Sequence, residues 1–187
     1  MKSSFLSTKK IQLTVIFIAY LIFASIFAFA YRYAINPDGV SLLRLAGYIA
    51  EGNFKYSVTS GYPPLISWLI SPFLFFGFDG LISARIVIAL CGAGLVLISW
   101  LLAYRFDLSD NIKFISVLVA TVLISFWTII NIGADILVTA LILCYIYLVT
   151  EPDILSNRKR LFFCGITGGF SYLAHHSAFP LFLSHLP

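Results

Sequence analysis

The sequence predicts an all-α fold, a polytopic transmembrane helix bundle with about five spans and two short external interfacial helices. Composition is the first reason: 60% of the 187 residues are hydrophobic and the mean hydropathy is +0.99. Charge is the second, because only 11% of the residues are charged, whereas soluble domains carry about 25%. The third is a set of uncharged runs of about 20 residues, each long enough to cross a bilayer, at 11–30, 86–104 and 114–134.

The chain is basic, with a formal net charge of +4 and a pI near 9.0. Membrane proteins concentrate Lys and Arg in their cytoplasmic loops, and the sequence contains no RNA-binding or zinc-finger pattern, so we expect no nucleic-acid partner. Cys91, Cys144 and Cys164 fall in separate apolar runs without CxxC spacing, which favours packing thiols over a metal site or a disulfide. The sequence assigns no metal ligand and no cofactor, and it leaves a requirement for a divalent metal open.

The first predicted span, 11–30, follows three lysines and ends on Ala28-Phe29-Ala30, which imitates a signal-peptidase site. The hydrophobic region of a signal peptide is usually about 7–15 residues long. This run is longer, and further spans follow it. An uncleaved first helix is therefore favoured over a removable signal.

The next segment, 31–85, is expected to be an external loop that carries two short helices. Residues 41–51 place apolar side chains on one face at helical spacing and polar ones on the other, which is typical of a helix at a membrane surface. Gly52 is its predicted end. The second helix, 65–76, is apolar but short, and Pro72 is expected to interrupt it.

Four further spans are predicted, at 86–104, 114–130, 136–150 and 161–183. The apolar stretch 114–150 is too long for one helix. A turn over residues 131–135, which contains Asn131, Gly133 and Asp135, is therefore expected to divide it.

The distribution of Lys and Arg predicts the topology, because these residues concentrate on the cytoplasmic side. If 65–76 does not cross the membrane, eight basic residues lie inside with the N-terminus, and the numbers invert if it crosses. The helix 65–76 is therefore expected to be interfacial or re-entrant, with Asp38 and Asp135 at the external face. The eight are Lys2, Lys9, Lys10, Arg105, Lys113, Arg158, Lys159 and Arg160, against Arg32, Arg44, Lys55 and Arg85 outside.

Five stretches form a pattern through their order and spacing along nearly the whole chain. They are Asn36-Pro37-Asp38-Gly39-Val40, Gly61-Tyr62-Pro63-Pro64-Leu65-Ile66-Ser67-Trp68-Leu69, Phe76-Gly77 followed by Ser83-Ala84-Arg85, Asp135-Ile136-Leu137, and Gly165–Tyr172 with Ala178-Phe179-Pro180. The pattern resembles the GT-C superfamily of membrane glycosyltransferases, and within it family 39, the protein O-mannosyltransferase and aminoarabinose-transferase branch. The resemblance implies that 1–187 is the N-terminal part of a single transmembrane domain of this type.

The resemblance also implies a chemistry. Such enzymes move a sugar from a polyprenyl-phosphate carrier to a hydroxyl acceptor on a lipid, glycan or protein, at the extracytoplasmic face of a membrane, here expected to be a prokaryotic cell membrane. Asp38 is the implied general base, with Asp135 assisting it or orienting the acceptor. Arg85, with Arg44 behind it, is expected to hold the donor phosphate. The residues expected to line the substrate cavity are Tyr62, Pro63 and His175.

The sequence departs from the family pattern at two site positions. Gly39 stands where many relatives have a second acid, and Tyr62 stands where some have Lys. Relatives are also longer and have more spans, so we expect this chain to be incomplete as an enzyme.

Each candidate residue also has a structural interpretation. Asp38 and Asp135 are placed to cap helices, Arg85 to reach lipid headgroups from a helix end, and His175 with His176 to pack inside the fifth span. The alternative to an enzyme is a non-enzymatic membrane protein, either a transporter or flippase fragment or an inactive truncated remnant. Transporters place charges near the bilayer midplane, whereas here the acids lie at one face, which favours a transferase.

Overall fold

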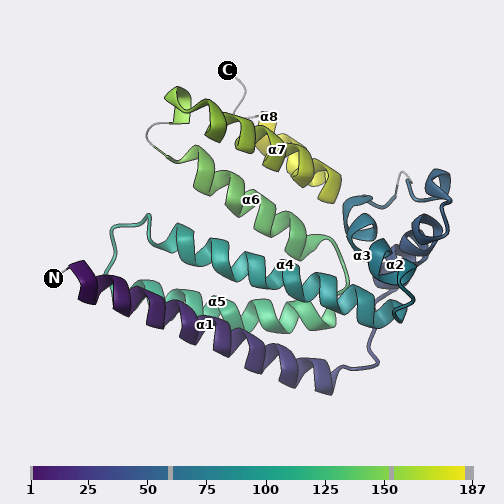
Figure 1. Ribbon diagram of the computed structural model, residues 1–187, viewed down its shortest axis with the longest axis horizontal. Helices are drawn as coiled ribbons and strands as arrows, with labels where there is room; N and C mark the ends of the chain where they lie inside the picture. Colours follow the sequence, from purple (N-terminus) through teal and green to yellow (C-terminus); the bar gives the residue numbers. More distant parts are fainter. Residues whose placement is uncertain (1, 59–60, 152–153, 184–187) are drawn as a thin grey trace.

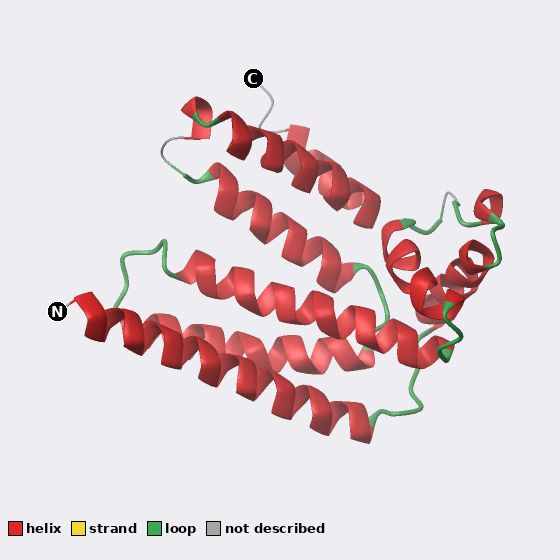
Figure 2. Cartoon of the chain, viewed as in Figure 1, coloured by secondary structure: helices red, strands yellow, loops and turns green. Residues whose placement is uncertain are grey.

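The computed structural model describes residues 2–58, 61–151 and 154–183, and these residues form helices and loops without a strand (Figure 2). The predicted all-α fold is confirmed. The α-helices of this part of the chain are α1 (Lys2–Ala30), α2 (Pro37–Ala50), α3 (Leu65–Phe75), α4 (Gly80–Ala103), α5 (Asp110–Ile130), α6 (Asp135–Val149), α7 (Arg158–Ala174) and α8 (Phe179–Leu183). Single 3-10 turns occur at η1 (Phe54–Tyr56), η2 (Ile154–Ser156) and η3 (His176–Ala178).

Five helices, α1, α4, α5, α6 and α7, run alongside one another and make up the body of the molecule (Figure 1). The helix α1 packs on α5, α4 packs on both α5 and α6, and α6 packs on α7. The helices α2 and α3 pack on each other at the end of the bundle where α1 ends and α4 begins (Figure 1). We call this the α2–α3 end, and the opposite end, where the chain starts, the N-terminal end.

Three of the described helical segments are long and apolar enough to cross a membrane: Lys9–Ala30, Gly80–Ala103 and Asp110–Ile130. The helix α6 is apolar but has 15 residues, which is about 22 Å at 1.5 Å per residue. The outer faces of α1 and α5 expose large apolar side chains such as Leu21 and Leu123, as expected of helices that contact lipid. The predicted apolar spans are therefore present in part, and the number five stays a prediction.

The helix α2 starts earlier than its apolar pattern indicates. It begins at Pro37 rather than Ser41, because proline fits the first helical turn, where no backbone N–H is needed. Gly52 ends it with a φ of +80°. The Gly52 N–H donates to the Ile49 carbonyl at 2.9 Å, and the next N–H donates to the Tyr48 carbonyl at 2.7 Å. These two bonds form a Schellman motif, which confirms the predicted end of the helix.

The predicted interruption at Pro72 is wrong, because α3 continues through it to Phe75. Proline cannot donate to the carbonyl one turn earlier. That carbonyl, of Trp68, instead accepts a hydrogen bond from the Ser71 hydroxyl at 3.0 Å. A second hydroxyl, of Ser67, donates to the Leu42 carbonyl of α2 at 3.1 Å and ties the two short helices together.

The helix α4 begins well before the predicted start at residue 86. Asp79 caps it, because its side chain accepts the Ile82 N–H at 3.0 Å. Arg85 therefore lies inside the helix rather than at its end. Its guanidinium donates to the backbone carbonyls of Tyr31 and of Ala34, the latter at 3.0 Å, which satisfies a charge that the sequence pattern placed outside the span.

The predicted continuous span at 161–183 is wrong, because α7 ends at Ala174. His175 is extended, with φ −162° and ψ 125°, and its Nδ1 accepts the Ser177 N–H at 3.2 Å. This local bond replaces the helical one. Pro180 has no N–H to continue a helix and lies instead at the start of α8.

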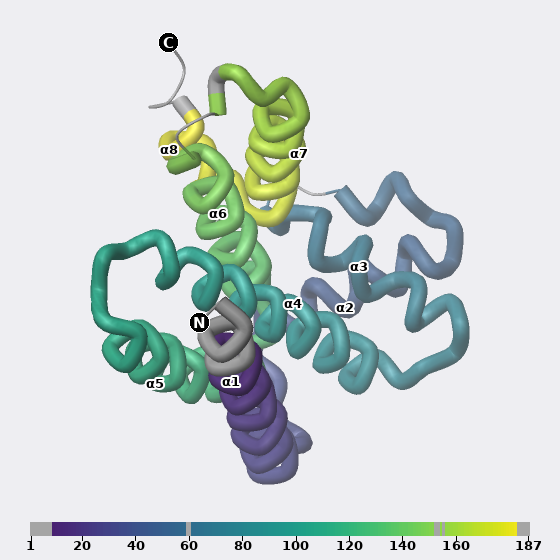
Figure 3. Tube along the Cα trace, turned by 60° about the vertical axis from the view of Figure 1, so that its left-hand side comes forward, coloured from purple at the N-terminus to yellow at the C-terminus, as the bar shows by residue number. Residues whose placement is uncertain are grey.

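The helix α8 folds back on the bundle beside α6 and α7 (Figure 3). The Phe182 ring meets the Tyr145 ring of α6 edge-on, with centroids 4.7 Å apart. It also lies against Gly168 of α7, where an added Cβ would stand 3.4 Å from the ring. Residues 176–183 therefore pack on α6 and α7 rather than continuing a span.

A cluster of buried apolar side chains holds the α2–α3 pair on the bundle. Leu42 of α2, Ile66 and Ile70 of α3, Ile88 of α4 and Ile132 of the α5–α6 turn are each at most 2% exposed. Because this cluster joins four segments, it fixes the loops that carry the polar side chains of the α2–α3 end.

Candidate functional site

A cavity of about 370 Å³ opens at the α2–α3 end, where the start of α2, the loop before α3, the α5–α6 turn and the end of α7 converge. Its lining contains five residues that the sequence singled out, namely Asp38, Tyr62, Pro63, Asp135 and His175. The remaining lining residues are Leu42, Gly61, Asn131, Gly133 and Ala134. Segments up to 137 residues apart in the chain thus meet at one site.

The side chain of Asn36 clamps the α1–α2 loop to the α5–α6 turn. Its Oδ1 accepts the Ile132 N–H at 2.9 Å, and its Nδ2 donates to the Ile132 carbonyl at 3.3 Å and to Asn131 Oδ1 at 2.8 Å. Asn131 in turn donates through Nδ2 to Asp135 Oδ2 at 2.8 Å. This orientation of both amides is consistent, since a carboxylate only accepts. The clamp holds the loop before Asp38 against the turn before Asp135.

Gly39 allows the two loops to come this close. A Cβ at Gly39 would stand 2.9 Å from both Asn36 Oδ1 and the Cβ of Ile132. A larger residue would push α2 away from the turn. The close approach of α2 to the α5–α6 turn therefore leaves no space for a side chain at position 39.

Asp38 lies in the first turn of α2, and Asn36 rather than Asp38 occupies the N-cap position. The capping interpretation of Asp38 is therefore wrong. Its exposed carboxylate accepts a hydrogen bond from the Tyr62 hydroxyl, with 3.3 Å between Oη and Oδ1. The hydrogen bond from Tyr62 restrains the Asp38 carboxylate at the rim of the cavity.

Asp135 is the first residue of α6, and Ala134 occupies the N-cap position without a side-chain bond. The capping interpretation of Asp135 is therefore wrong as well. The hydrogen bond from Asn131 fixes one of its oxygens. The cavity thus holds two carboxylates, each at a helix N-terminus and each restrained by one neighbouring polar side chain.

His175 stands at the end of α7 rather than inside a span, so its predicted position is corrected although it lines the predicted cavity. Its Nδ1 faces both the N–H and the hydroxyl of Ser177, at 3.2 and 2.6 Å. Because the N–H can only donate, Nδ1 acts as the acceptor and the ring proton of the neutral form resides on Nε2. The His176 ring stacks on it with centroids 4.8 Å apart.

Arg85 and Arg44 do not line this cavity. Arg85 holds the carbonyls that follow α1, as described above, and its buried Nε has no acceptor among the described residues. Arg44 is exposed on α2 and donates from Nε to the Tyr48 hydroxyl at 3.0 Å. Among the described lining residues there is no Lys or Arg, so the cavity is acidic.

The sequence did not single out Asn36 and Gly39 as residues that shape the site. Asn36 is the N-cap of α2, and residues 37–39 lie in its first turn, but the partners of the Asn36 side chain lie almost 100 residues further along the chain. No local signal identifies such a contact. Asn131 was assigned to a turn for its composition alone, and its contact with Asp135 follows from that turn.

Comparison of the chain with protein-family models, with curated proteins and with solved structures gave no match.

Proposed function

We propose that the chain belongs to a membrane-embedded glycosyltransferase of the GT-C type, which moves a sugar from a polyprenyl-phosphate carrier to a hydroxyl acceptor. The observation that supports the proposal is the convergence of Asp38, Asp135, Tyr62, Pro63 and His175 on one cavity. These residues come from the stretches on which the resemblance rests, or lie next to them. They are far apart in the sequence, so their meeting is not a consequence of chain proximity.

The polar groups of the cavity suit a ligand rich in hydroxyls. Carboxylates accept hydrogen bonds from hydroxyls, the Asn131 amide can donate and accept, and the His175 ring can donate from Nε2. In the proposed reaction Asp38 takes the proton of the acceptor hydroxyl, and the acceptor oxygen forms a bond to the anomeric carbon. The bond from that carbon to the phosphate oxygen breaks, and the polyprenyl phosphate leaves with the electron pair. Asp135, held by Asn131, orients the acceptor.

The leaving phosphate needs cations that the described lining of the cavity does not supply. The buried Nε of Arg85 has no acceptor among the described residues, and Arg85 is the cation that the sequence pattern selects for the phosphate. We therefore propose that the acidic cavity binds the acceptor and the sugar. The phosphate of the donor would lie outside the described lining of this cavity.

The proposed topology has the α2–α3 end at the external face of a prokaryotic cell membrane and the N-terminus in the cytoplasm. The support is the bias of Lys and Arg toward the N-terminal end of the bundle. The helices α2 and α3 then act as the two external interfacial helices, with α1, α4, α5, α6 and α7 as the five spans.

A second candidate function is non-enzymatic binding, as in a transporter or flippase fragment or an inactive remnant. The absence of Lys and Arg from the described lining favours it, because an acidic cavity binds polyhydroxyl or cationic solutes without any need for a phosphate donor. The two candidates differ in one respect that can be measured, namely whether the donor is consumed.

The test uses the full chain in lipid nanodiscs with polyprenyl-phosphate mannose and other polyprenyl-phosphate sugars carrying a radiolabel on the sugar. Asp38→Asn is expected to lower donor consumption about 10²–10⁴-fold, the usual contribution of a general base. The matched control is Asp79→Asn, at the same end but outside the cavity. Because Asn caps a helix as well as Asp does, this control keeps α4 intact and should retain full activity.

Wild-type turnover by the Asp38→Asn variant would contradict the assignment of Asp38 as the base. If the wild-type chain consumes no donor but binds a sugar saturably, the non-enzymatic binding function is favoured.

A further inference from the structure

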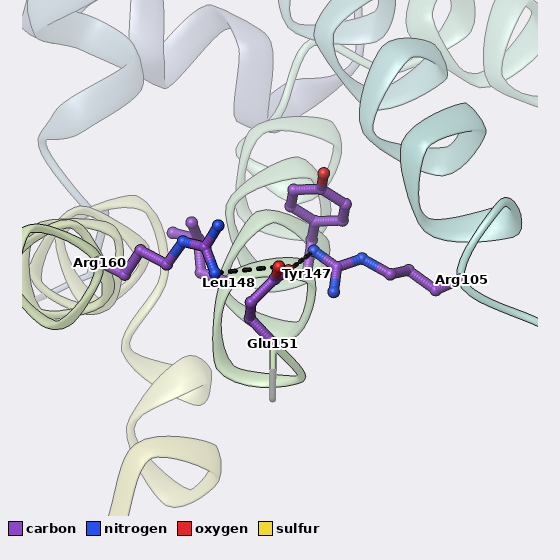
Figure 4. A pocket seen from close by; sticks show the side chains of 5 residues that line it. All are labelled: Arg105, Tyr147, Leu148, Glu151 and Arg160. Carbon is purple, nitrogen blue, oxygen red and sulfur yellow. Dashed lines mark ion pairs between the residues drawn. The ribbon is translucent and has the colours of Figure 1, made fainter. Parts of the chain in front are cut away.

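A second polar site lies at the N-terminal end of the bundle, opposite the acidic cavity. Arg105 follows α4, Glu151 follows α6, and Arg160 lies in the first turn of α7. Figure 4 shows both guanidinium groups directed at the one carboxylate. Arg105 pairs with Glu151 Oε2, and Arg160 Nη1 lies 2.9 Å from Oε1. With Tyr147 and Leu148, these residues line a hollow of about 330 Å³.

The hollow has more positive charge than its carboxylate balances. Two guanidinium groups share Glu151, and each Arg has five N–H donors, so most of their donors are directed elsewhere. The Arg105 guanidinium lies over the Tyr147 ring, with 4.2 Å between its Cζ and the ring centroid. This cation–π contact restrains the guanidinium, and the N–H donors of an Arg can hold a phosphate in a two-point grip.

More cations stand beside the hollow. Arg158 and Lys159 precede Arg160 in the first turn of α7 and line an adjoining depression with it. That first turn contains no acidic residue, although the N-terminus of a helix favours negative charge. Around both depressions the described residues carry four cationic side chains and one carboxylate, and an anion there would relieve the repulsion.

The surroundings of the cations are apolar, which identifies the kind of anion. Leu161, Phe162 and Phe163 follow Arg160 directly and are 42, 66 and 55% exposed. Phe106 follows Arg105 and is 57% exposed. A soluble phosphate would leave these side chains in contact with water, whereas a lipid covers them with its acyl chains while its headgroup reaches the cations.

We propose that this hollow, between the ends of α4, α6 and α7, binds the phosphate of an anionic phospholipid of the adjacent leaflet. Basic pockets between transmembrane helices on the cytoplasmic side are suited to such headgroups. Arg105 and Arg160 hold the phosphate oxygens, and Arg158 and Lys159 add attraction from the rim. Glu151 spaces the two guanidinium groups and keeps them in place when no lipid is bound. The proposal is independent of sugar transfer at the opposite end.

The test measures lipid retained by the full chain in native mass spectra, after equal exposure in detergent to phosphatidylglycerol or to phosphatidylcholine. Phosphatidylglycerol is expected to be retained in preference. Arg158→Gln and Lys159→Gln, whose side chains take no part in the Glu151 ion pairs, should each weaken its retention about fivefold, the usual contribution of one cation near an anionic surface. Arg160→Gln should weaken it at least as much.

Two matched variants separate lipid binding from a purely structural role. Lys113→Gln removes a cation that pairs with Asp110 at the same end, and it should leave retention unchanged. Glu151→Gln removes the competing carboxylate and should keep or raise retention of phosphatidylglycerol. Equal retention of the two lipids by the wild-type chain, or unchanged retention in the Arg158→Gln, Lys159→Gln double variant, would overturn the proposal.

Soluble phosphate is the remaining rival for the site. Glycerol 3-phosphate, added at the same concentration, is expected not to displace bound phosphatidylglycerol. Displacement at equal concentration would show that the headgroup chemistry alone is recognised and would overturn the assignment to a lipid.

Discussion

Replacement of Asn36 by Ala tests whether the Asn36 clamp shapes the candidate site. The substitution removes three hydrogen bonds between the α1–α2 loop and the α5–α6 turn, two of them to the backbone of Ile132. Ile132 is 1% exposed, so its N–H and carbonyl find no water in place of the lost partner. Each bond contributes about 1 kcal/mol net, and the three together about 3 kcal/mol.

A loss of about 3 kcal/mol corresponds to roughly a hundredfold rise in the population of the detached loop. The reporter is amide hydrogen exchange, since the Ile132 N–H is protected by Asn36 Oδ1 and exchanges only when the loop opens. Exchange in a peptide covering residues 131–138 should accelerate by about that factor in the Asn36→Ala variant, in detergent at constant pH.

The matched control is Asn53→Ala, in the loop between α2 and α3 at the same end of the bundle. The Asn53 side chain makes a single long hydrogen bond, to Glu51 at 3.4 Å on the surface, so its loss should leave exchange at 131–138 unchanged. Exchange at wild-type rates in the Asn36→Ala variant would refute the reasoning, because the loop would then be held by apolar packing alone. Acceleration in both variants would mean that the whole α2–α3 end had loosened.

Two further predictions concern the bundle itself. Gly92→Ala should lower the free energy of unfolding by about 1–3 kcal/mol, because the new Cβ would stand 2.5 Å from the buried Tyr20 hydroxyl. The thermal midpoint measures this loss. Gly94→Ala is the neutral control, because a Cβ there meets nothing within 4 Å. The hydrogen bond from Arg105 and the nearby positive charges hold the pKa of the Glu151 carboxyl below its usual 4.5. The ion pairs of Glu151 therefore stabilise the fold above about pH 4.5, and this contribution is lost as the pH falls through the lower folded value. The difference in thermal midpoint between wild type and Glu151→Gln should shrink over that range, and a constant difference from pH 3 to 7 would contradict it.

The sequence predicted the presence of the helices better than the residues at which they begin and end. Uncharged runs located the cores of α1, α4, α5 and α6, but the start of α4 was placed too late because Arg85 was taken as the edge of the span. Two carbonyls at the end of α1 satisfy that charge, and only a tertiary contact can do so. The end of α7 was missed for a different, local reason, since a hydrogen bond from the Ser177 N–H to His175 Nδ1 replaces a helical bond in an apolar segment.

The candidate site was anticipated in part. Asp38, Tyr62, Pro63, Asp135 and His175 were chosen from the sequence, and the structure brings all of them to one cavity. The two arginines selected for the donor phosphate lie elsewhere, because their side chains are held by neighbouring groups that no sequence pattern identifies. The phosphate-binding role of these arginines stays a prediction.

The sequence by itself determined that the chain is helical, where its apolar segments lie, and which glycine ends α2. These features depend on local chemistry. A helix satisfies its own backbone, and composition and Gly or Pro placement largely decide where it can form. Only the tertiary structure decided that Asn36 meets Ile132 and that Glu151 stands between two arginines. These contacts join segments that are distant along the chain, and they depend on helix lengths and packing angles, which the sequence pattern of any one segment does not contain.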